Sequence, residues 1–329
     1  MTSNIHDVAA AAGVSIATVS RVFNGQRVSP DRAKRVRDAA RRLNFSPNRA
    51  ARTLRRKHSE VIALIIPDVE NPYFTAMARG VEDSAQRAGY SVVLCNTDDQ
   101  DEKESQYLRI AVSENMAGVV VVPNGPTPDL LSYVASGRHV VAIDRQLDLG
   151  ADEVLLDNVA AGRMATGALL DAGHRHVGLV TGPSHLSSAH DRVIGWRAAY
   201  GERGLEVDET LVEHGDFRVA GAREAMRALL GTGAEIDAVV AGNNLSGIGA
   251  FQVLARAGTV PPAFGFAIIG DLPFTTMVSA RITRVGLPAR EMGIRAADML
   301  IDRIGGHGGG PRTLTLQPEI LPVEEDWTV

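Results

Sequence analysis

Apolar side chains recur at helical spacing in two short runs near the start of the chain, with a glycine between them. Asn4, followed by an acidic residue three positions later, is a helix N-cap signal, and Gly13 can adopt the backbone angles that end a helix. Ser15 can cap the helix that follows. We therefore predict helices over residues 5–12 and 16–23, joined by a short turn. The apolar stripe of the first helix consists of Ile5, Val8, Ala9 and Ala12.

A third helix is predicted from Pro30, because proline is favoured at the first helical position and Ser29 precedes it as a cap. Apolar positions at helical spacing continue to Leu43. The first 45 residues thus predict a small all-helical module with a short glycine-containing turn between its first two helices.

From Glu60 onward the pattern changes to short apolar runs that alternate with amphipathic helical segments. Alternation of this kind is typical of parallel sheets covered by helices on both faces, and about 270 residues suffice for two such layers in tandem. The predicted strands lie at residues 61–67, 92–96, 118–123, 139–144, 153–157, 176–182, 238–243 and 263–270.

Charge divides the chain at the same place. Residues 1–58 carry 13 Lys and Arg against 3 Asp and Glu, whereas the rest of the chain carries 21 against 36. A basic module attached to an acidic body fits a protein of which one end meets a polyanion. A solvated basic helix remains the alternative on charge alone.

Composition removes several classes of protein. No apolar run approaches the roughly 20 residues of a membrane span, and residues 1–10 do not read as a secretion signal, so we expect a cytoplasmic protein. Cys95 is the single cysteine, which excludes an internal disulfide and a cysteine-based zinc site. The glycine-rich stretch at residues 305–310 lacks the Lys-Ser/Thr of a phosphate-binding loop. We therefore predict neither a metal nor a cofactor.

A helix, short turn and helix of this kind bind DNA by placing the second helix in the major groove. Its N-terminal residues and those one turn later, Ile16, Ala17, Ser20 and Arg21, then face the bases, and Arg21 can bond both acceptors on a guanine edge. Short polar groups suited to phosphate oxygens are Ser15, Thr18, Ser20 and Asn24. The alternative is an ordinary three-helix surface module.

The segment DVAAAAGVSIATVSRVFNG resembles the DNA-binding headpiece of the lactose/galactose repressor (LacI/GalR) family. The resemblance implies double-stranded operator DNA as partner, with Ser29 and Asn48 among the contacts. It also implies a hinge helix over residues 47–56, with Leu54 as a wedge in the minor groove, although Leu54 packing one helix on another is the alternative. The expected domains are a headpiece (1–46), a hinge and linker (47–59) and an effector-binding and dimerisation domain (60–329).

The body resembles the same family in NPYF, in GHRHVGLVTGP and in the helix after Pro288. This implies a type I periplasmic-binding-protein-like fold, with two parallel-sheet subdomains, three crossovers and a small sugar-like effector in the cleft. Tyr73 and Phe74 would stack on a sugar ring, and Phe217 would close its other face. The hydroxyls would bond to Asp144, Arg145, Arg192, Asn243 and Asp271.

Each of these side chains also has a structural alternative. Arg145 can form an ion pair, Phe217 can belong to the core, and Asp144 can cap a helix. Asp157 is a weaker candidate that can equally cap the next helix. Leu287 departs from the family, in which a pocket glutamine is common.

Two other classes of protein share features with this chain. The body has acids and histidines, including His174 and His176, but no arrangement meets a catalytic template, so we do not expect an enzyme. A transport-type binding protein shares the body's architecture but has no use for residues 1–58. We therefore predict a transcriptional regulator, a repressor controlled by its effector, that binds a pseudo-palindromic operator as a homodimer, because one recognition helix reads too few base pairs.

Overall fold

The computed structural model describes residues 4–23, 26–45, 59–147, 149–259, 261–271 and 282–322. The chain divides into two compact units, Met1–Ser59 and Glu60–Val329. No helix within these described ranges is both long and apolar enough to cross a membrane.

The first unit contains three helices at the predicted places: α1 (Ile5–Ala12), α2 (Ile16–Phe23) and α3 (Pro30–Arg42). Asn4 caps α1 in a reciprocal capping box, and Gly13 ends it with a φ of 61°. The Ser15 hydroxyl accepts the backbone N–H of Thr18 at 3.2 Å, which confirms it as the cap of α2. Ser29 occupies the N-cap position of α3, but its side chain makes no capping hydrogen bond. A small core holds the helices together: Val8, Ala9, Ala12, Val19, Val36, Ala39 and Ala40.

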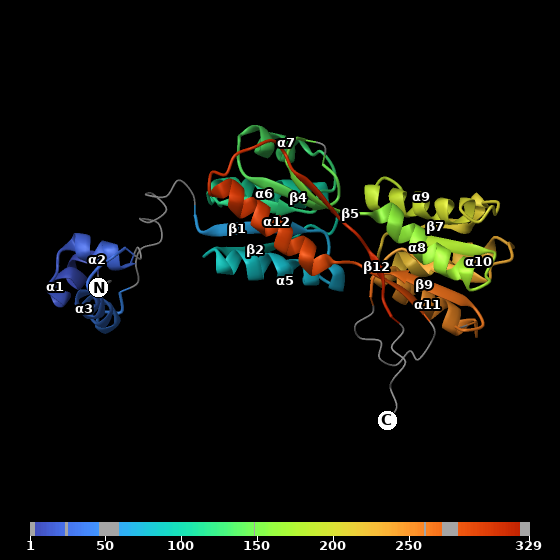
Figure 1. Cartoon of the computed structure of the whole chain (residues 1–329), viewed down its shortest axis with the longest axis horizontal. Helices are drawn as coiled ribbons and strands as arrows, with labels where there is room; N and C mark the ends of the chain where they lie inside the picture. The colour runs from blue at the N-terminus through green and yellow to red at the C-terminus, as the bar shows by residue number, and fades with distance from the viewer. Residues whose placement is uncertain are drawn as a thin grey trace, which may run out of the picture. The chain divides into compact units, whose positions relative to one another are not determined.

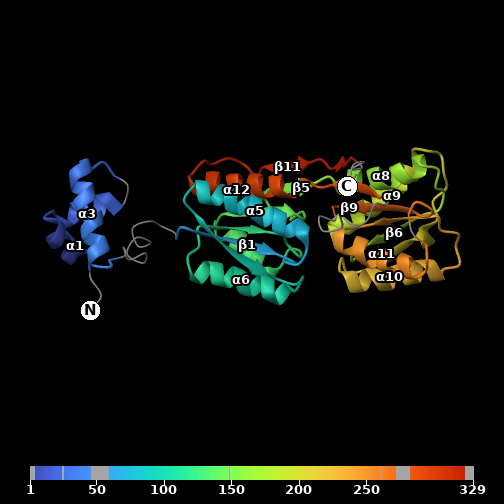
Figure 2. The same ribbon diagram turned by 90° about the horizontal axis from the view of Figure 1, so that it is seen from below.

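The second unit contains two six-stranded sheets, each between two layers of helices, as Figure 2 shows. The first sheet has the order β11-β5-β4-β3-β1-β2 and is parallel throughout. Its strands are β1 (Val61–Ile66), β2 (Ser91–Asn96), β3 (Gly118–Val121), β4 (Val140–Asp144), β5 (Asp152–Leu156) and β11 (Thr313–Leu316).

Side chains alternate between the two faces of this sheet, and each face packs on a layer of helices. On β1, Ile62 and Leu64 face a core shared with α5 (Pro72–Arg87) and α12 (Ala289–Ile304). Ala63 and Ile65 face the opposite core, beneath α6 (Asp101–Ser113) and α7 (Pro128–Ala135). This explains why β1 reads as an uninterrupted apolar run.

The second sheet has the order β12-β10-β9-β8-β6-β7, and only the short edge pair β12–β10 is antiparallel. Its strands are β6 (Val177–Thr181), β7 (Val212–His214), β8 (Ala238–Ala241), β9 (Gly265–Ile269), β10 (Thr283–Gly286) and β12 (Glu319–Ile320). One face packs on α8 (Asn158–Asp171) and α9 (Ser187–Gly201), and the other on α10 (Val219–Gly231) and α11 (Asn244–Arg256). A single 3₁₀ turn, η1 (Glu209–Leu211), precedes β7.

The chain crosses between the two sheets three times: after β5, after β10 and after β11. Figure 1 shows the orange-red α12 packed on the first subdomain although it follows strands of the second. The predicted two-subdomain architecture with three crossovers is therefore confirmed, as are the eight predicted strands. Four strands were not predicted: β7, β10, β11 and β12.

Candidate functional site

A pocket lies between the two subdomains of the second unit, at the carboxyl ends of their strands, where parallel sheets place ligands. Its empty volume is about 500 Å³. Seven of the eight predicted effector residues line it: Tyr73, Phe74, Asp144, Arg145, Arg192, Phe217 and Asn243. The other lining residues are Asp68, Asn71, Asp99, Ser188, Asp216, Arg218, Asn244 and Leu287.

Tyr73 and Asp144 form one wall of the pocket. The Tyr73 hydroxyl donates to Asp144 Oδ1 at 2.6 Å, and the Tyr73 and Phe74 rings meet edge to face with centroids 5.1 Å apart. Burial raises the pKa of Tyr73 well above its usual range, and the neighbouring Asp144 carboxylate raises it further. Tyr73 therefore stays protonated and holds Asp144 as an oriented acceptor. Asp144 does not act as a helix cap, because it ends β4.

Arg192, on α9, is buried in the opposite wall. Its Nε donates to Asn158 Oδ1 at 3.0 Å, and its Nη1 donates to the Gly242 carbonyl. Burial lowers the pKa of Arg192, and the Asp144 carboxylate opposes that shift. An arginine nonetheless remains charged at neutral pH, so this guanidinium presents a fixed positive charge to the pocket.

Phe217 lies against Arg192, with the guanidinium carbon 5.5 Å from the centroid of its ring. Its φ of 61° is unusual for a residue with a large side chain, and the Asn243 side chain fixes this turn by donating to the Phe217 carbonyl at 2.9 Å. A Cβ on Gly182 would lie 2.1 Å from the Phe217 ring, so only glycine leaves room for it. Left-handed backbone at a large residue costs about 1–3 kcal/mol, and such strain is typical of functional sites.

Arg145 both lines the pocket and forms the ion pair that was its structural alternative. Its Nη2 lies 2.9 Å from Asp99 Oδ1, and its Nη1 donates to Asn124 Oδ1 at 3.2 Å. Its buried Nε has no hydrogen-bond partner in the described part of the chain, and neither has Oδ1 of Asn244. A buried donor and a buried acceptor without partners are costly, and a bound ligand with hydroxyl groups can satisfy both.

Asp271 is the exception among the predicted effector residues. It does not line this pocket but a neighbouring groove, and its carboxylate lies 3.0 Å from Nη1 of Arg284. This ion pair provides a structural reason for the acid at the end of β9. Asp157, the weaker candidate, caps α8 by accepting the backbone N–H of Ala160 at 2.8 Å.

Sequence reasoning missed several lining residues, above all Asp68 and Arg218. Asp68 follows β1 after one intervening residue, Pro67, where the rule of polar residues at strand ends points to it. Arg218 stands only four residues after β7, a three-residue strand that the apolar pattern did not reveal. No group of three or more His, Cys, Asp or Glu in the described ranges is arranged to hold a metal ion.

In the first unit, α2 presents the predicted recognition residues to solvent. Ile16, Ala17 and Arg21 are exposed, whereas Val19 on the other side of the helix is buried. The Ser15 hydroxyl lies 2.9 Å from that of Thr18, so two of the predicted phosphate contacts bond each other at the start of the helix. Ser20 is half-buried, and Ser29 is exposed before α3. The predictions for Asn24, Asn48, Leu54 and the hinge helix lie outside the described residues.

Known proteins resemble both units. Residues 4–48 match the family model for bacterial regulatory proteins of the lacI family. Residues 59–321 match the model for periplasmic binding proteins and the sugar-binding domain of the LacI family.

Individual relatives align over nearly the whole chain. The ribose operon repressor of Bacillus subtilis (strain 168) is 33% identical over 301 residues, which cover 91% of each protein. The structure of the transcriptional regulator CelR in complex with cellobiose is 29% identical, with a TM-score of 0.71, covering 97% of this chain and 98% of that one. The lac repressor dimer bound to operator and the anti-inducer ONPF has a TM-score of 0.85 at 21% identity, covering 98% of each chain, which shows a shared fold.

Proposed function

Since the chain belongs to the LacI family of bacterial regulatory proteins, we propose that it is a sequence-specific transcriptional repressor whose affinity for its operator is controlled by a sugar or sugar derivative. Its family and its relatives are transcriptional regulators rather than enzymes. Because its target is genomic DNA in a bacterium, we place its action in the cytoplasm.

The composition of the pocket carries the proposal of a sugar. Aromatic rings lie in both walls, Tyr73 in the first subdomain and Phe217 in the second. Carboxylate and guanidinium groups lie between them, and each can serve two adjacent hydroxyls of a polyol. Relatives named for ribose and for cellobiose agree with this class of ligand.

We assign the ligand contacts as follows. Tyr73 and Phe74 stack against one face of the sugar ring and Phe217 against the other. Asp144 and Arg192 are the principal charged partners of the hydroxyls, Arg145 contributes its unpaired Nε, and Asn243 takes part from the start of α11. Asn244 joins the set through its unpaired Oδ1, whereas Asp271 is left out because Arg284 neutralises it.

We further propose that two copies of the chain bind a pseudo-palindromic operator. Exposed Ile16, Ala17 and Arg21 on α2 read base edges in the major groove, and one such helix reads too few base pairs to specify a genomic site. A two-fold-related second headpiece doubles the number of base pairs read. Asn48 and Leu54 are proposed as hinge contacts, with Leu54 wedged into the minor groove.

Selection of binding sites from a random duplex library tests this function. The full-length protein should enrich a pseudo-palindrome, and its affinity should fall steeply with salt because bound phosphates release counterions. Arg21→Ala should relax one base pair in each half-site and weaken operator binding by about 1–3 kcal/mol. Arg35→Ala, which removes an exposed arginine of α3 paired with Asp31, is the matched control and should keep the base preference. Enrichment of asymmetric single sites, or an unchanged preference in Arg21→Ala, would count against the assignment.

A further inference from the structure

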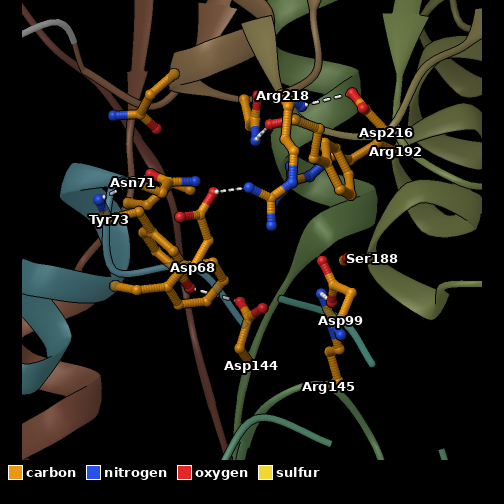
Figure 3. Close-up of a pocket in the computed structure, with 15 residues that line it drawn as sticks. Asp68, Asn71, Tyr73, Asp99, Asp144, Arg145, Ser188, Arg192, Asp216 and Arg218 are labelled. Carbon is orange, nitrogen blue, oxygen red and sulfur yellow. Dashed lines mark hydrogen bonds and ion pairs between the residues drawn. The ribbon is translucent and has the colours of Figure 1, made fainter. Parts of the chain in front are cut away.

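Arg218 extends from the second subdomain to the first. It immediately precedes α10, and its guanidinium lies 3.4 Å from Asp68 Oδ2 and 3.8 Å from Asp98 Oδ1. Figure 3 shows Asp68 and Arg218 pointing toward one another beside the pocket. Within the described ranges, every ion pair that joins the two subdomains involves Arg218.

The backbone that presents Arg218 is held on both sides. The Arg218 N–H donates to Asp216 Oδ1 at 2.9 Å, and the carbonyl of the preceding Phe217 accepts from Asn243. Phe217 itself has a left-handed φ of 61°. Because of this turn, the Phe217 ring lies against Arg192 inside the pocket, and the Arg218 side chain extends across the cleft to the first subdomain.

The acceptors on the first subdomain are equally well fixed. Asp68 Oδ1 accepts the backbone N–H of Glu70 at 2.9 Å, and its side chain is only 9% exposed. Asp98 accepts from Asn96 at 2.8 Å and pairs with Lys103. The hydrogen bond from Lys103 lowers the pKa of Asp98, and Arg218 adds to that shift. Both carboxylates are therefore held in position to pair with a cation from the opposite subdomain.

We infer that Arg218 is a positioning residue that stabilises the closed arrangement of the two subdomains over the pocket, by pairing with Asp68 and Asp98 of the first subdomain. Its ion pairs with Asp68 and Asp98 are made by the closed cleft and lost when the subdomains move apart. By raising the population of the closed form, Arg218 sets both the apparent affinity and the release rate of the effector. The inference rests on the proposed function only in taking this cleft as the effector site.

Hydrogen exchange of the full-length protein without effector or DNA tests it. Arg218→Gln and Asp68→Asn should each raise exchange roughly two- to fivefold at residues 71–75 and 187–192, since a partly exposed ion pair contributes up to about 1 kcal/mol. These segments line the pocket but make no ion pair with Arg218, so they report opening of the cleft rather than a local change. Asp68→Asn keeps a side-chain oxygen that accepts the Glu70 N–H, which favours normal folding.

A double variant shows whether Arg218 and Asp68 act through their ion pair or whether each substitution disturbs the protein independently. If the two side chains act on each other, Arg218→Gln with Asp68→Asn should open the cleft little more than either change alone. Arg197→Gln, which breaks the exposed pair with Glu209 in the second subdomain, should leave exchange at both segments unchanged. If hydrogen exchange is unchanged in both single variants, or if the effects of the two substitutions on exchange are additive in the double variant, Arg218 does not hold the cleft closed through Asp68. Because no sugar is present, either result is independent of whether the pocket binds one.

Discussion

Asp152 shows how a single buried charge can stabilise this fold. It begins β5, its side chain is 1% exposed, and it accepts hydrogen bonds from Arg303 and Arg312 at 2.6–3.0 Å. Burial alone would raise the pKa of Asp152, but the bonds from the two arginines outweigh it and lower the pKa to about 2. The network ties β5 to α12 and to the segment that leads into β11.

This network predicts a defined acid transition. A carboxyl whose pKa is lowered by folding contributes stability above its unfolded pKa, near 4, and loses that contribution as the pH falls toward 2. Asp152→Asn should therefore lower the free energy of unfolding at pH 7 by about 2 kcal/mol and flatten its decline between pH 4 and pH 2. Urea titrations over this pH range measure both effects.

Asp302→Asn provides the matched control. Asp302 also pairs with Arg312, at 3.2 Å, but its side chain is 52% exposed, so its removal should cost no more than about 1 kcal/mol. Equal losses for the two variants, or an acid limb in Asp152→Asn identical to that of the wild type, would contradict the account.

The sequence was sufficient to predict individual pocket residues that belong to a recognisable motif or that end a clearly apolar strand. Tyr73 and Phe74 follow the β1 strand in a recognisable segment, and Asp144 ends an obvious apolar strand. Asp271 looked equivalent, but its pairing with Arg284 depends on β10, which the apolar pattern did not reveal. Single residues at strand ends can thus be located from sequence, whereas their partners require the register of the sheet.

Helix pairs in the body cross at glycines, which allow the backbones to touch. On α9, a Cβ at Gly195 would lie 2.1 Å from the Val159 carbonyl oxygen and 2.7 Å from the Arg163 nitrogen, both on α8. The first subdomain has the same kind of crossing: a Cβ at Gly80 on α5 would lie 2.1 Å from the Arg290 carbonyl oxygen on α12, and a Cβ at Gly293 on α12 would lie 2.1 Å from the Met77 carbonyl oxygen on α5. Each subdomain is therefore built around a close crossing that admits no side chain.

The α8–α9 crossing predicts a large difference between two glycines of one helix. Gly195→Ala should destabilise the protein by about 1–3 kcal/mol, because the obstructing atoms belong to the backbone and cannot rotate away. Gly201→Ala, at the end of the same helix, meets nothing within 4 Å and should be neutral or stabilising by up to about 1 kcal/mol. Thermal unfolding of both variants decides the matter, and equal melting temperatures would refute the close crossing.

At the level of elements, long apolar strands and capped helices were predictable, and short edge strands were not. Seven of the eight predicted strands are mostly buried, and the eighth, β2, is an apolar edge strand that is largely exposed. By contrast, β11 and β12 are short, have no buried residue and contain few apolar residues. These edges form only because the rest of the sheet supplies a partner strand. Their sequence therefore carries little signal of its own, and the antiparallel β12–β10 pair could not be foreseen.

For the whole molecule, the cleft links two subdomains whose relative position a ligand can change. Arg192 and Phe217 contribute from the second subdomain, and Tyr73, Asp144 and Arg145 from the first. A sugar that contacts both sets favours one arrangement of the subdomains over another. In the proposed dimer we expect that choice to change the spacing of the two DNA-binding headpieces, so effector and operator affinities should be coupled.

Operator binding by fluorescence anisotropy, with and without a sugar that raises the melting temperature, tests this coupling most directly. The account predicts that the sugar changes operator affinity at least about fivefold and that the operator changes sugar affinity by the same factor. Arg192→Ala should abolish the response while nearly preserving sugar-free operator affinity, whereas Arg163→Ala, at an exposed pair with Glu202, should respond as the wild type does. Identical operator affinity with and without every stabilising sugar, or a full response in Arg192→Ala, would contradict it.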